Sequence, residues 1–167
     1  TPHIKISTLY NPSMSYELFL EPFMVPAVLH LLLCCCVAFA IGQEFKRNTF
    51  AEWVNPQQIV SSFLGKILVY VCIFCFWTWS WMFWLAHIRG YFIAGSLSLI
   101  LIAQFLLYFA YAVISSTVVL ATKDLPKTFG FIALYGGSSP SFSGITLPLN
   151  HAPAFPQCWS LIIPYTP

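Results

Sequence analysis

The sequence predicts an all-α protein, a polytopic bundle of helices that crosses a membrane several times. Hydrophobic residues make up 59% of its 167 residues and charged residues only 7%, whereas soluble domains carry about 25% charge. The chain also contains uncharged runs of the length that a helix needs to cross a bilayer, about 20 residues. With a net charge of +2 and no basic run, the chain is expected to meet membrane lipid and no nucleic acid.

Four membrane spans are expected in order along the chain, at residues 22–41, 67–88, 91–122 and 128–149. The first has Pro22 and Pro26 in its first turns, where a missing backbone N–H costs least. The second lies between Lys66 and Arg89, and the third contains Gln104 as its only strongly polar side chain. These three runs carry no formal charge and predict complete spans.

The fourth run is less apolar than the others. The stretch GGSSP at 136–140 lies in its middle, which predicts a short or broken span because glycine and proline weaken a helix. Residues 1–21 precede the spans, and residues 150–167 form a proline-rich tail that cannot be one regular helix. We expect residues 1–21 to be the end of a segment outside the membrane, and residues 150–167 to be a truncated outer segment.

The basic residues predict the orientation. Segments 42–66 and 123–127 together hold five of them: Lys46, Arg47, Lys66, Lys123 and Lys127. The opposite side holds only Lys5 and Arg89. By the positive-inside rule, residues 42–66 are expected in the cytoplasm.

The cysteines predict packing and no disulfide framework, since five of the six lie in apolar runs. Cys72 and Cys75 have the spacing of zinc and redox sites, but no second pair or acid lies near them. His30 and Cys34 share a helix face, yet two ligands do not close a zinc site. No metal site is expected, and a hydrogen-bonded histidine inside the bundle is the favoured interpretation of His30.

Residues 42–66 hold five of the chain's twelve formal charges: Glu44, Lys46, Arg47, Glu52 and Lys66. Thr49 precedes Glu52 at the spacing of a capping box, and Phe50, Trp53 and Val54 would share a helix face. A second short apolar set follows before the next span. These patterns predict one or two short amphipathic helices at the membrane surface. Composition alone favours an ordinary charged loop over a docking element.

Several short features follow one another in a distinctive order. They are Asn11-Pro12 before the first span, QEFKRNTFAEW at 43–53, LGKILVY at 64–70, the Arg89-Gly90 turn, Ser115-Ser116, and Ser143-Gly144 with Pro148. Their order and spacing resemble the C-terminal transmembrane portion of an ABC exporter permease of the type-two class. Asn48 stands where that class usually has glycine, and Val69 where it has proline.

The resemblance implies a function and a set of partners. It implies a bacterial inner-membrane permease that acts as a homo- or heterodimer and moves a substrate outward. ATP and Mg²⁺ would bind a separate ABC ATPase subunit, and this chain would be non-catalytic and bind no cofactor. The segment that couples to the ATPase would include Glu44, Lys46, Arg47, Thr49, Phe50, Glu52 and Trp53.

Other residues suggest further interpretations. Trp77, Trp81 and Gln104 lie inside spans and are candidates for lining the translocation path, although packing, an aromatic belt or an interhelical hydrogen bond is the plainer interpretation. The first rival function is an intramembrane enzyme that uses Ser143 or the cysteines, with His151 as base. The second rival is a membrane scaffold that transports nothing.

Overall fold

A computed structural model describes residues 15–54, 57–93, 95–144, 149 and 152–165. Its elements are α1 (Tyr16–Arg47), α2 (Phe50–Trp53), α3 (Ile59–His87), α4 (Leu97–Thr122), α5 (Leu125–Phe142) and α6 (Ala154–Ser160). The described part contains helices and no strand, which confirms the all-α prediction.

Three of the described helices, α1, α3 and α4, are long and apolar enough to cross a membrane. They overlap the predicted spans 22–41, 67–88 and 91–122. The third begins only at Leu97, after Ser96 as its N-cap. The segment before it turns at Gly90, whose φ is 68°. The predicted fourth span overlaps α5, which ends at Phe142 and is not among the three. The division into outer, membrane and cytoplasmic segments stays a prediction.

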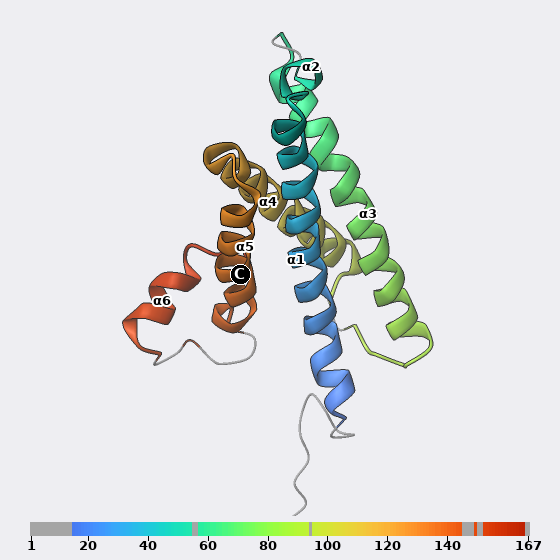
Figure 1. Ribbon diagram of the computed structural model, residues 1–167. Helices are drawn as coiled ribbons and strands as arrows, with labels where there is room; N and C mark the ends of the chain where they lie inside the picture. Colours follow the sequence, from blue (N-terminus) through green and yellow to red (C-terminus); the bar gives the residue numbers. More distant parts are fainter. Residues whose placement is uncertain (1–14, 55–56, 94, 145–148, 150–151, 166–167) are drawn as a thin grey trace, which may run out of the picture.

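Helix α1 is the central element of the bundle. Figure 1 shows α3 and α5 on opposite sides of it and α4 running obliquely behind it. One face of α1 buries Leu33, Val37 and Ile41 in a cluster with α3 and α4. Another buries Cys34 and Ala38 in a cluster with α4, α5 and the tail. Both sets recur every four residues, the spacing of one helix face, so α1 separates two cores.

The outer surface of the bundle is apolar. In the most apolar stretch of α1, 44% of the residues are buried, against 17% in α3 and in α4. On α3 the outward side chains include large aromatics, with Phe76 65%, Trp77 61% and Phe83 66% exposed. Soluble monomers rarely expose so much continuous apolar surface, and hydrocarbon is the solvent that favours it.

Two tight turns lie toward the same end of the bundle (Figure 1). Asn48, between α1 and α2, and Lys123, between α4 and α5, adopt left-handed backbone conformations with φ of 56° and 49°. Asp124 then begins α5 as its N-cap and accepts a hydrogen bond from the Lys127 amide. These local signals reverse the chain after α1 and after α4.

Buried hydroxyls link the long helices. Tyr108 of α4 and Thr78 of α3 are both fully buried, and their hydroxyl oxygens lie 2.6 Å apart. Ser115 of α4 donates to the Cys34 carbonyl of α1 over 2.7 Å. Hydrocarbon offers no hydrogen-bond partner for a hydroxyl, so these buried hydroxyls bond to groups on neighbouring helices and link them.

We expect Thr78→Val to lower the stability of the bundle by about 1 kcal/mol, because the buried Tyr108 hydroxyl loses this bond. The measurement is equilibrium unfolding of the purified protein in a mild detergent. Thr117→Val is the matched control, since the exposed Thr117 donates to the Val113 carbonyl of its own helix. Equal losses in the two variants would contradict the interhelical role of Thr78.

Candidate functional site

The charged segment begins on the last turns of α1. This helix continues past the apolar run to Arg47, and the left-handed Asn48 then turns the chain into the one-turn helix α2. Asparagine tolerates this conformation better than most residues, and glycine adopts it most freely. The second apolar set belongs to the first turns of α3.

An ion pair joins the two long helices at this end. Glu44 of α1 and Lys66 of α3 lie 2.7 Å apart, oxygen to nitrogen. The second carboxylate oxygen of Glu44 accepts a hydrogen bond of 2.5 Å from the Thr49 hydroxyl. The Lys66 ammonium also lies 4.2 Å from the centre of the Trp53 ring of α2, within cation–π range. We call Glu44, Thr49, Trp53 and Lys66 the clamp.

The clamp is partly shielded from water. The side chains of Lys66 and Glu44 keep only 20% and 23% of their exposure. The hydrogen bonds from Lys66 and then from Thr49 lower the pKa of the Glu44 carboxyl from its ordinary value. Glu44 lies beyond the apolar run of α1. Because its pKa is lowered, its carboxylate is ionised at neutral pH.

Aromatic rings pack beside the clamp. Phe45 stacks on Phe50 with 4.4 Å between ring centres, and Phe63 of α3 lies 4.8 Å from Trp53. Phe50 also lies 5.9 Å from Trp53 and 6.2 Å from Phe63. The rings of Phe45, Phe50, Trp53 and Phe63, which we call the aromatic cluster, join α1, α2 and α3.

The predicted capping box is wrong. Thr49 does occupy the N-cap position of α2, but its side chain makes no capping bond. Its hydroxyl donates to Glu44 instead, because the left-handed turn at Asn48 brings Thr49 back over the end of α1. The carboxylate of Glu44 is a stronger acceptor than a neutral group.

The structure divides the seven predicted coupling residues into two groups. Four point into the segment, as members of the clamp or the aromatic cluster: Glu44, Thr49, Phe50 and Trp53. Three are exposed: Lys46, Arg47 and Glu52. Lys66 and Phe63 were not among the predicted site residues, because only the return of α3 beside α1 brings them to Glu44 and Trp53.

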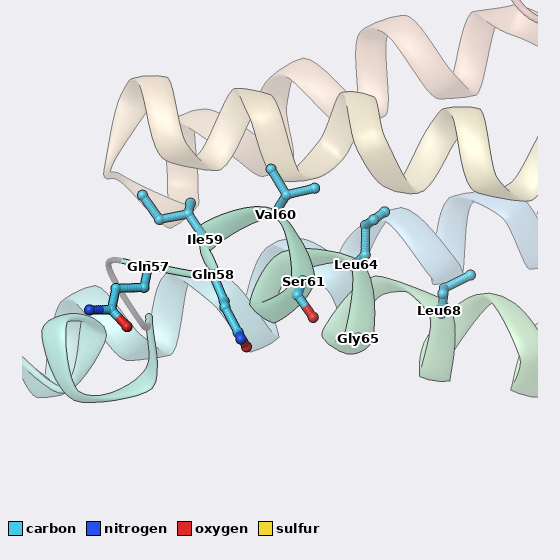
Figure 2. A pocket seen from close by; sticks show the side chains of 8 residues that line it. All are labelled: Gln57, Gln58, Ile59, Val60, Ser61, Leu64, Gly65 and Leu68. Carbon is cyan, nitrogen blue, oxygen red and sulfur yellow. The ribbon is translucent and has the colours of Figure 1, made fainter.

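An open groove lies beside the clamp at the start of α3. Its lining residues are Gln57, Gln58, Ile59, Val60, Ser61, Leu64, Gly65 and Leu68. Figure 2 shows Leu64 and Leu68 projecting from one side of α3, with the polar Gln58 and Ser61 on the other. A side chain at Gly65 would meet no atom within 4 Å. The groove is thus an unfilled apolar surface with a polar edge.

A family model described as "ABC-2 family transporter protein" matches residues 1–167. The chain belongs to the ABC-2 family. No curated protein and no solved structure matches this sequence. Membership establishes a multi-pass membrane component of a transporter.

The three path candidates of this ABC-2 protein differ in exposure. Trp77 is largely exposed on the outside of α3, and Trp81 is half-buried. Gln104 is half-buried on α4, and its Nε2 atom has no hydrogen-bond partner within the described residues. Their role in a translocation path stays a prediction.

The other candidate residues lie in different surroundings. His30 bonds to the Gly136 carbonyl, which confirms the prediction of a hydrogen-bonded histidine. Cys75 is buried in the first core and Cys72 is exposed. Ser143 donates to the Pro140 carbonyl over 2.7 Å, while His151 lies outside the described residues.

A double-mutant cycle on the clamp tests its energy. We expect Glu44→Gln and Lys66→Met to show a coupling of about 1 kcal/mol in unfolding experiments, larger at low salt than at high salt. Lys127→Met is the control, because the Lys127–Asp124 pair is 3.3 Å long and Lys127 is 74% exposed. Additive losses at positions 44 and 66 would show that the pair contributes no energy.

Proposed function

We propose that this ABC-2 protein is the permease subunit of an ATP-driven exporter in the bacterial inner membrane, and that residues 42–66 couple it to a separate ATPase. ABC-2 permeases normally work with an ATPase subunit. The observation that carries the proposal is the clamp, which fastens α2 to the ends of α1 and α3. A push on α2 would therefore move both long helices together.

Several contacts hold α2 in place. This helix has only four residues, too few to be stable alone, so its position depends on its neighbours. Glu44 holds Thr49 on one side, and Lys66 holds Trp53 on the other. The stacked rings of Phe45 and Phe50 add a contact that resists tilting. Closure of two ATPase subunits against α2 would move the helix ends instead of bending a loop.

The contact with the ATPase would use the outward side chains. Lys46, Arg47 and Glu52 would set the register and speed the encounter. Phe50 and Trp53 already pack inside the segment, so the apolar part of the contact would come from the exposed Ile59 and Val60 at the edge of the groove (Figure 2).

The ATP chemistry would belong to the partner subunit. These 167 residues contain no Gly-x-x-x-x-Gly-Lys-Ser/Thr sequence, the loop that cradles nucleotide phosphates. ATP and Mg²⁺ would thus be held by the ATPase, and the permease would bind no cofactor.

A second permease copy would complete the translocation path. Helix α5 presents exposed small residues along one face, namely Gly130, Ala133, Gly137 and Ser141. A side chain at Gly130 or Gly137 would meet nothing within 4 Å. Small residues allow two membrane helices to approach closely, so this face supports pairing with another copy.

Charge reversal tests the docking surface. We expect Arg47→Glu combined with Glu52→Lys to reduce recovery of the ATPase with the full-length permease by roughly tenfold, since rim charges govern encounter and register. The measurement is co-purification with an ATPase encoded beside the gene, at fixed salt. The control is Lys123→Glu, an exposed lysine outside the segment. Unchanged recovery in the double variant would remove the assigned docking role.

Thiol accessibility tests the orientation. A membrane-impermeant maleimide added to intact cells is expected to label the exposed Cys158, because the tail is predicted to lie outside. A thiol introduced by Ala51→Cys, on the exposed side of α2, should be labelled only after the membrane is opened. Cys158→Ser provides the background. Labelling of position 51 from outside would reverse the proposed topology.

A further inference from the structure

Helix α5 has a gap in its backbone hydrogen bonds, and α1 fills it. Pro140 lies inside α5 and has no N–H, so it cannot donate to the carbonyl of Gly136 four residues earlier. The Nε2 atom of His30 in α1 lies 3.1 Å from that carbonyl oxygen, in a buried contact. An orphaned carbonyl in the membrane interior is costly, and His30 satisfies it.

The contact defines which ring nitrogen of His30 carries hydrogen. A carbonyl oxygen only accepts, so Nε2 must be the donor. In the neutral ring Nδ1 is then a lone-pair acceptor, and it has no hydrogen-bond partner within the described residues.

Neighbouring groups hold the ring and the carbonyl close together. A Cβ on Gly136 would lie 2.9 Å from Leu31 Cδ2 and 3.6 Å from His30 Nε2, so a larger residue would require the Leu31 side chain to shift. The rings of Tyr111 and Tyr165 lie 4.6 and 5.4 Å from that of His30, centre to centre. The side chain of His30 is fully buried among them.

We propose that His30 is a positioning residue that completes α5 across the Pro140 gap and sets the angle between α1 and the C-terminal part of α5. Two bonds attach the tail to the same part of α5: Trp159 donates to Ser138, and the Tyr135 hydroxyl donates to the Ile162 carbonyl. Moving α5 at the gap would thus move the tail. The consequence for transport rests on the proposed exporter function.

A mutant cycle separates this role from simple packing. His30→Phe keeps a ring against Tyr111 and Tyr165 but removes the donor, whereas Pro140→Ala gives α5 its own donor to Gly136. We expect His30→Phe to lower the unfolding midpoint of the full-length protein by roughly 2–4 °C, and to lower it by less than half as much in the Pro140→Ala background. Equal shifts in both backgrounds would overturn the proposal.

A spectroscopic measurement reads the tautomer of His30 in the wild-type protein. Nitrogen-15 NMR of histidine-labelled wild-type protein is expected to show His30 as the neutral Nε2–H form, assigned with His30→Gln. A neutral Nδ1–H form would overturn the proposal. His30→Gln is also expected to retain stability better than His30→Phe, since an amide N–H can donate to Gly136.

A transport assay gives a result that a purely structural role of His30 would not change. With the ATPase present, substrate moved per ATP is expected to fall roughly threefold to fivefold in His30→Phe and to recover in His30→Gln or after Pro140→Ala. An unchanged ratio would overturn the positioning role. Failure of the wild type to transport would instead count against the exporter function, because the midpoint cycle and the NMR signal do not depend on transport.

Discussion

The structure depends on α1 packing against the other long helices through two faces at once. Leu33, Val37 and Ile41 face α3 and α4, while Cys34 and Ala38 face α5 and the tail. Lipid gives no hydrophobic drive for helices to associate, so this packing rests on close contact and interhelical hydrogen bonds. A helix that is buried on two sides has less surface left for lipid than a helix that is buried on one side. This explains why α1 is more buried than α3 and α4.

Polar groups inside the bundle serve as cross-links because hydrocarbon cannot satisfy them. Thr78 joins Tyr108 between α3 and α4, and Ser115 joins the Cys34 carbonyl between α4 and α1. His30 differs from these hydroxyls, since it repairs a backbone gap on another helix. The weak sequence of α5 around Pro140 is thereby compatible with a continuous helix.

The charged residues at one end of the bundle have two roles. Glu44 and Lys66 neutralise each other and hold α2 between α1 and α3. Lys46, Arg47 and Glu52 remain exposed, where they are free to meet solvent or another protein. Trp53 belongs to the first group because the Lys66 ammonium lies against its ring. A large aromatic in a charged segment is thus an internal support, although its type alone suggests an interface anchor.

Composition and uncharged runs were sufficient to predict the helical membrane bundle, since burying or solvating so many apolar side chains leaves few other solutions. Motif order identified the family, and residues 42–66 stood out by charge alone. Local sequence could not reveal that Glu44 meets Lys66 or that His30 meets Gly136, because these contacts join residues 22 and 106 positions apart. Thr49 also matched a capping box, but the turn at Asn48 gave its hydroxyl a carboxylate instead. Nearby residues determine which segments form helices. The contacts between helices exist only once α1 has packed against its neighbours.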